Sequence, residues 1–338
     1  MRHSPKSIVF FAFFVIVFAA GALPAWAETR ASAQAENVDS GRGYGFAIST
    51  GLGFLFGTSY EIVYQYTGEK DYLSELQWNI KPLLFMGINL DFGLKNPMKK
   101  PGFFAGLGFK SALPMETGIM EDRDWMQPST VPGALTHFSS HENHTRAALF
   151  VNHDAGLSLP LRKLVLKFHF NLDYMYFKWE ALNGYTQYDP ADSYPSIPWN
   201  SGFPKIPFSG TGIRYTQHWF LLSTGAGAEF PLGRFTFSAS VIIGLSNCIA
   251  TDEHLSRDPP FKTTAYLSNG FAIKPKMGTF FSLSNRFDLG LFFGYLYIGE
   301  TRGGSLFEDT NGVQYFILDI EGARLKVFEG NLLLRYRF

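Results

Sequence analysis

Apolar and polar residues alternate in many segments of this chain, and the C-terminal end shows the pattern most clearly. One face of that end is wholly apolar and consists of Leu332, Leu334, Tyr336 and Phe338. Arg335 and Arg337 lie between them. Because successive residues of a strand point to opposite sides, this order predicts a strand with an apolar outer face and a charged inner face. Such a strand is typical of a barrel that lipid surrounds.

Similar segments recur along the chain and predict about ten strands. They cover residues 44–66, 73–92, 103–113, 147–159, 164–179, 212–230, 235–246, 262–283 and 288–298, followed by the strand that ends at Phe338. Several are longer than the roughly 9–11 residues that cross a bilayer. We therefore expect the barrel to project above the membrane.

The connections between these segments alternate in length. Residues 160–163, 231–234 and 285–288 are tight turns, whereas the regions around 118–145, 180–210, 248–262 and 301–313 are long and polar. Residues 67–70 are a short turn on the long-loop side. Short turns on one side and long loops on the other distinguish outer-membrane barrels from soluble β-sandwiches. The prediction is one all-β, transmembrane antiparallel β-barrel whose side chains leave no wide channel.

The N-terminus predicts a secretory signal peptide over residues 1–27. Arg2 and Lys6 precede an apolar run over 8–20, and Ala25-Trp26-Ala27 supplies the small-x-small cleavage pattern. The alternative is an uncleaved anchor, since the run is slightly shorter than the roughly 20 residues of a spanning helix. With cleavage, residues 28–338 form a single barrel domain.

Composition narrows the function further. Lys and Arg together number 29, as do Asp and Glu, so no basic excess indicates nucleic-acid binding. The one cysteine, Cys248, excludes an internal disulfide and is expected to be a buried apolar residue. Several aromatic residues are expected to form girdles at the membrane interface: Trp78, Trp179, Trp219, Phe292 and Phe293.

Two short polar runs carry the candidate chemistry. Asp122 and Asp124 form one pair, Asp252 and His254 the other, and residues two apart share one face of a strand. The pairs follow the third and seventh predicted strands, so they should face each other across the outward mouth of the barrel. Asp252 could orient His254 as a general base, while the two aspartates position a water, with no covalent intermediate. The alternative is that these are solvated loop side chains.

At these residues the sequence resembles the omptin family of outer-membrane aspartate/histidine endopeptidases. The runs DRDWM at 122–126 and DEH at 252–254 carry the resemblance, and GTSYEIVY at 57–64 and LSELQW at 73–78 support it. The resemblance implies a ten-stranded barrel in the bacterial outer membrane whose site faces the exterior and cleaves extracellular polypeptides. It implies catalysis by water held between the Asp–His and Asp–Asp pairs, without metal or cofactor.

The resemblance also implies cleavage near basic residues, through a carboxylate on the first strand and another two positions before the DEH run. Glu61 matches the first as a substrate-binding residue, but Ala250 stands at the second and offers no charge. A cation held by one carboxylate is bound less tightly than one held by two. The expected partners are extracellular peptides or proteins and outer-membrane lipid, with lipopolysaccharide left open, and we expect a monomer.

Two further groups of residues resemble ligand sites only in part. His137, His141 and His144 beside Glu142 could suggest zinc, but the H-E-x-x-H spacing is absent, so no metal is expected. Gly51-Leu52-Gly53 lacks the full dinucleotide fingerprint, so no cofactor is expected. Two further functions stay open: a catalytically degenerate barrel that acts as a surface adhesin or receptor, and a small porin, which the strand number disfavours.

Overall fold

The computed structural model describes residues 43–65, 72–308 and 312–338. The predicted signal peptide at 1–27 and the predicted turn at 67–70 lie outside these ranges. Within the described ranges, no helix is long and apolar enough to cross a membrane.

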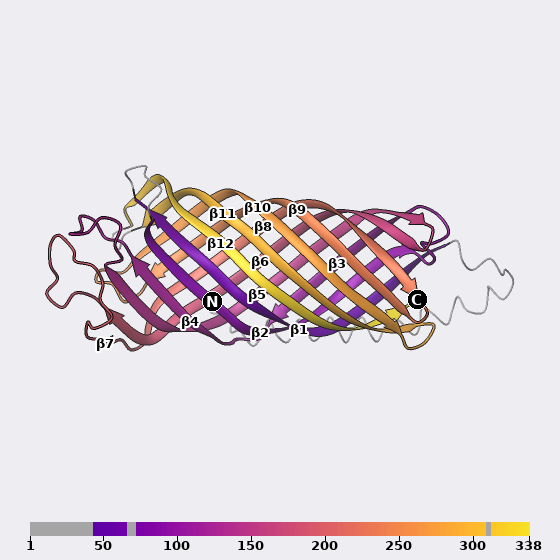
Figure 1. The fold of residues 1–338 in the computed structure, drawn as a ribbon, viewed down its shortest axis with the longest axis horizontal. Coiled ribbons are helices and arrows are strands. Elements are labelled where there is room, and N and C mark those ends of the chain that lie inside the picture. Colours follow the sequence, from indigo (N-terminus) through magenta and orange to yellow (C-terminus); the bar gives the residue numbers. More distant parts are fainter. Residues whose placement is uncertain (1–42, 66–71, 309–311) are drawn as a thin grey trace. The chain divides into compact units, whose positions relative to one another are not determined.

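The chain from Tyr44 onward forms one antiparallel sheet that closes on itself (Figure 1). Strand β1 pairs with β2 on one side and with β12 on the other, so the first and last strands are neighbours. The strands are β1 (Tyr44–Tyr64), β2 (Tyr72–Leu94), β3 (Gly102–Ala112), β4 (Met115–Asp124), β5 (His137–Leu161), β6 (Leu164–Gln187), β7 (Ile206–Pro207), β8 (Thr211–Leu232), β9 (Phe235–His254), β10 (Phe261–Ser282), β11 (Phe287–Glu308) and β12 (Gln314–Arg337).

These twelve described strands occupy ten positions around the ring. Strands β3 and β4 share one position, because both lie between β2 and β5. They are separated at Leu113 and Pro114, where proline cannot donate a backbone hydrogen bond to a neighbouring strand. The two-residue β7 only extends the edge of β6. The predicted barrel of about ten strands is therefore confirmed.

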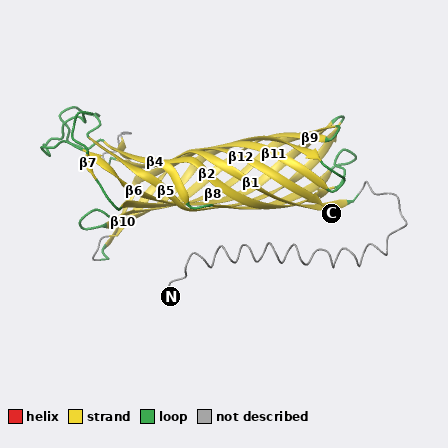
Figure 2. Cartoon of the chain, turned by 90° about the horizontal axis from the view of Figure 1, so that it is seen from below, coloured by secondary structure: helices red, strands yellow, loops and turns green. Residues whose placement is uncertain are grey.

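The predicted long loops are too long, because the strands continue through much of them. Strand β4 runs to Asp124, β6 to Gln187, β9 to His254 and β11 to Glu308. In these stretches apolar and polar residues no longer alternate in the phase seen nearer the C-terminal end of the barrel, while the hydrogen bonds between strands continue. The longer loops still gather at the end near β7, and the end near the C-terminus has short ones (Figure 2).

The end of the barrel that contains the C-terminus carries a belt of apolar side chains on its outer face. On β12, Leu332 is 52% exposed and Leu334 is 45% exposed, as the alternating pattern predicts. Between them and beyond, Arg335 and Arg337 point inward and form ion pairs with the buried Asp288, at 2.8 and 2.9 Å. The outer face of the same strand becomes charged at Lys326 and Arg324, which marks the upper border of the belt.

The inside of the barrel changes character at about the same height. Below it, charged side chains pair across the interior, as in Lys110 with Glu329 at 2.7 Å and Lys274 with Asp173 at 2.6 Å. Above it lies a packed apolar core to which nearly every strand contributes. The filled interior agrees with the prediction that the barrel holds no wide channel.

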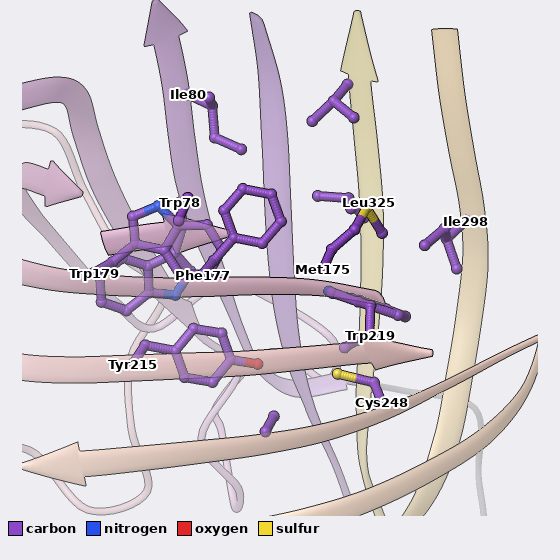
Figure 3. Packing of buried hydrophobic residues seen from close by; sticks show 14 of the residues in the cluster. Trp78, Ile80, Met175, Phe177, Trp179, Tyr215, Trp219, Cys248, Ile298 and Leu325 are labelled. Carbon is purple, nitrogen blue, oxygen red and sulfur yellow. The ribbon is translucent and has the colours of Figure 1, made fainter. Parts of the chain in front are cut away.

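Four residues of this core form what we call the aromatic floor: Trp78, Phe177, Trp179 and Tyr215. Phe177 stacks on Trp179 with ring centroids 4.9 Å apart, and Trp78 stacks on Tyr215 at 5.4 Å (Figure 3). Its two tryptophans and Trp219 are fully buried, so their prediction as membrane girdles is wrong. Cys248 is also fully buried beside Trp219, as expected.

Candidate active site

Five acidic side chains gather at the outer end of the barrel, immediately above the apolar core. We call Glu61, Asp122, Asp124, Asp252 and Glu321 the acidic cluster. The inward residue two positions deeper on the strand is Met120 below Asp122, Ala250 below Asp252 and Ala323 below Glu321, each fully or almost fully buried. The carboxylates therefore rest on an apolar surface that cannot solvate them. Burial is the largest cause of the raised pKa values of Glu61, Asp122, Asp124 and Glu321.

Asp252 and His254 are in contact at the end of β9. The Nε2 of His254 lies 2.5 Å from the Oδ2 of Asp252, whose side chain is 4% exposed. The imidazole stacks on Phe261 of β10 with ring centroids 4.4 Å apart. Strand β9 is anchored here because the backbone nitrogen of the next residue, Leu255, donates to the carbonyl of Gly212.

This contact fixes how His254 can act. If Nε2 donates its proton to Asp252, the other ring nitrogen, Nδ1, is the basic one. Among the described residues Nδ1 has no hydrogen-bond partner, and the side chain keeps 15% of its surface exposed. The imidazole is thus oriented to accept a proton from a water at the mouth of the barrel.

Asp122 and Asp124 sit at the end of β4, held by the neighbouring strand. The hydroxyl of Ser74 on β2 donates to the Oδ1 of Asp122 at 3.1 Å. Beyond Asp124 the chain turns, and the backbone nitrogen and hydroxyl of Thr136 both donate to the Asp124 carbonyl. The predicted loop position of this pair is wrong, since both residues belong to a strand that two neighbours pair.

The pKa of each aspartate in this pair is raised. Burial raises the pKa of Asp122 most, and the negative charge of Asp124 adds to it. Burial also raises the pKa of Asp124, while the hydroxyl of Ser74 and the charges of His137 and Arg257 oppose that rise. The carboxyls of the buried Asp122 and the half-buried Asp124 lie close together, which favours a state in which they share one proton.

The two pairs face one site, as the strand count predicts. Going around the ring, β4 and β9 are separated by β5, β6 and β8 on one side. Their charges nevertheless interact across the barrel, because Asp252 contributes to the raised pKa of Asp122. Glu61 lies among them: burial raises the pKa of its carboxyl strongly, and the charges of Asp252, Glu321 and Asp122 raise it further.

Sequence reasoning did not single out Glu321 or Tyr188. Burial, with the charge of Asp252, raises the pKa of Glu321 to about 7. Burial and the charges of Asp122 and Asp124 raise the pKa of Tyr188 to about 12, and its ring packs edge-on against His137. Neither residue belongs to a recognisable motif, and only the closed ring brings them beside the two pairs.

The three histidines that could suggest zinc are on β5 and do not lie in a loop. His141 has both ring nitrogens engaged, with the carbonyl of Asn183 and the hydroxyl of Ser139. The Nε2 of His144 lies 3.7 Å from the Oε2 of Glu142. In the parts of the chain that the structure describes, no three His, Cys, Asp or Glu side chains are arranged to hold a metal ion.

A sequence model of the Omptin family matches residues 43–338, which is the whole barrel. The chain belongs to the Omptin family. It is accordingly a protein of the bacterial outer membrane, as its apolar belt and closed ring of strands already indicate. A comparison with curated protein sequences found no match.

Solved structures place this omptin barrel among known folds. It superimposes on the outer membrane protease OmpT from Escherichia coli with a TM-score of 0.76 and 16% identity, covering 87% of this chain and 97% of that one. The translocator domain of the autotransporter NalP from Neisseria meningitidis matches with a TM-score of 0.36 and 12% identity, covering 95% and 98%. At these identities the first match shows a shared barrel fold, and the second is too weak to carry an argument.

Proposed function

We propose that this omptin is an endopeptidase that cleaves polypeptides outside the cell, using a water activated between Asp252–His254 and Asp122–Asp124. The observation that carries the proposal is the buried contact of 2.5 Å between His254 and Asp252, in an acidic cluster that also contains the Asp122–Asp124 pair. Membership of the Omptin family and the barrel shared with OmpT support it.

In this mechanism His254 is the general base. Its Nδ1 takes a proton from the attacking water, and Asp252 stabilises the imidazolium that forms. The Asp122–Asp124 pair holds the same water from the opposite side. A proton shared by that pair can be donated to the carbonyl oxygen as it becomes negative, which lowers the barrier to attack.

In this mechanism the substrate forms no covalent bond to the enzyme. The proton that His254 accepts is later transferred to the nitrogen of the leaving amine as the C–N bond breaks. The Asp122–Asp124 pair takes back the proton that it gave to the oxygen as the C=O bond reforms, which completes hydrolysis and restores the site. Glu61 lies beside Asp252 and binds a basic side chain next to the scissile bond, which gives the enzyme its preference for basic residues.

The test is cleavage of a randomised peptide library by the purified barrel in detergent, with and without lipopolysaccharide. Wild type is compared with Asp252→Ala and His254→Ala, and folding is checked for every variant. Cleavage that both substitutions abolish supports the proposal. A folded wild-type barrel that cleaves no peptide would contradict it and favour the adhesin or receptor alternative.

A further inference from the structure

Glu321 is the acidic residue that the proposed mechanism leaves unused. It lies on β12, next to the strand that carries Glu61, and the register pairs Glu61 with Ala323. Both glutamates are buried, at 3% and 5% exposed. Inward residues that are diagonal across two paired strands have Cβ atoms about 7 Å apart, so their carboxyl groups can reach one common point.

The surroundings of these two glutamates contain acids and hydroxyls. Glu321 is faced by Asp252 and His254 from β9, by Thr263 from β10 and by Ser305 from β11. Glu61 is faced by Asp252, by Asp122 from β4 and by the phenol of Tyr215 from β8. Among the described residues, neither glutamate forms an ion pair with a lysine or arginine.

Acids that point into the barrel at a lower level have cationic partners. Asp288, Asp173 and Glu329 each have a cationic partner within 3 Å. At the mouth, by contrast, the Oε2 of Glu61 and the Oδ1 of Asp252 are buried and have no donor among the described residues. A buried carboxylate oxygen without a donor is costly, so this arrangement favours the arrival of a cation from outside the chain.

The geometry points to a two-carboxylate site in which Glu61 and Glu321 together hold the cationic side chain of a substrate residue. Glu321 supplies from β12 the second carboxylate that Ala250 lacks on β9. This inference rests on the proposed function, because it identifies which residue of a polypeptide the site takes. A side chain held there lies beside Asp252, which places the neighbouring peptide bond near His254.

The small residues beneath the pair fit this role. Ala250, Ala265 and Ala323 are all buried, and the register places Ala250 opposite Ala265. An aspartate at position 250 would add a further negative charge beside Asp252. With the second carboxylate on β12, the cation still has two acids as partners. Both then lie on the neighbouring strands β1 and β12.

The first experiment measures the dissociation constants of peptides, so that binding is separated from turnover. A peptide with arginine at the cleavage position is compared with the same peptide carrying citrulline, the neutral isostere of arginine. Asp124→Asn serves as the background, because it removes one carboxylate of the proposed catalytic pair and leaves Glu61, Glu321 and His254 in place. We expect Glu321→Gln to reduce the preference for arginine over citrulline about 10- to 100-fold, as for a lost hydrogen bond between two charged groups.

The second experiment measures the same preference in kcat/KM of the otherwise unaltered enzyme. Glu61→Gln should reduce it as Glu321→Gln does, and the double variant should show no discrimination. Glu308→Gln, which removes an acid at the same end of the barrel outside the acidic cluster, is the matched control and should change nothing. Glu321→Asp should recover part of the preference.

The outcomes separate this inference from the proposed function. If Glu321→Gln folds and keeps the wild-type preference for arginine in both experiments, the two-carboxylate site is wrong even where cleavage depends on His254. If the barrel binds arginine through Glu321 but cleaves nothing, the cation site stands and the endopeptidase proposal fails. If the barrel does not distinguish arginine from citrulline at all, the inference is overturned.

Discussion

Replacing Asp252 by asparagine is the sharpest test of how the site works. The substitution keeps the size of a side chain that is 4% exposed and removes the charge that faces the Nε2 of His254 at 2.5 Å. Breaking a buried charged pair costs about 3–5 kcal/mol, and in this reaction the loss falls on the imidazolium that forms in the transition state. At 1.36 kcal/mol for each factor of ten, kcat should fall by about 10²- to 10⁴-fold. KM should change little, because Asp252 is not the principal contact of the substrate.

The same substitution should not weaken the barrel. Asp252 raises the pKa values of Glu61 and Glu321, which shows that its charge repels theirs, so asparagine relieves part of that repulsion. Steady-state cleavage of a quenched fluorescent peptide gives kcat, and thermal unfolding in detergent gives the stability. Glu253→Gln is the control. Glu253 is next to Asp252 in the chain, but its carboxylate pairs with Arg214 at 2.8 Å, away from the acidic cluster. A folded Asp252→Asn barrel whose kcat stays within tenfold of wild type would refute the proposed role of the pair.

Further predictions concern the surroundings of the site. Ser74→Ala should lower kcat about tenfold and move the acidic limb of the pH–rate profile upward, because the Ser74 hydroxyl lowers the pKa of Asp122; an unmoved profile would remove Ser74 from the mechanism. The pKa of the Glu321 carboxyl is raised to about 7, so its contribution to the free energy of unfolding should be full below pH about 4.5 and be lost as pH rises through 7. The contribution should be on the order of 3 kcal/mol, and thermal unfolding of Glu321→Gln should lack this pH dependence. Trp179→Ala should cost about 3–5 kcal/mol in thermal unfolding, and the lipid-facing Phe170→Ala much less, with equal losses counting against the aromatic floor. Planar bilayers containing the wild-type barrel should show no stepwise conductance, because apolar side chains fill the interior.

The lower half of the barrel could be predicted because lipid surrounds it. On β6, Phe168, Phe170 and Leu172 are each close to half exposed and repeat every second residue, which is the signal that the alternation detects. Higher on the same strand the apolar positions move to the other face, where Phe177 and Trp179 are fully buried. A pattern read in one phase along the whole strand therefore assigns the tryptophans to the wrong side.

The candidate site could be predicted only in part for a similar reason. The DRDWM and DEH runs are recognisable in the sequence, and the order of strands is enough to place them opposite each other. Glu321 has no such signature, since the outer part of β12 reads QYFILDIE and its irregular pattern does not mark one acid as inward-facing. Its importance depends on closure of β12 against β1, which joins the two ends of the described barrel.

The aromatic floor also determines where a substrate can enter the barrel and where the products can leave it. A packed apolar layer beneath the acidic cluster separates the outer mouth from the charged interior below it. A polypeptide that enters from outside can leave only through the opening by which it came, and so can both fragments after cleavage. On the proposed function, the products stay in the surroundings of the cell, and the barrel alters its environment without importing anything from it.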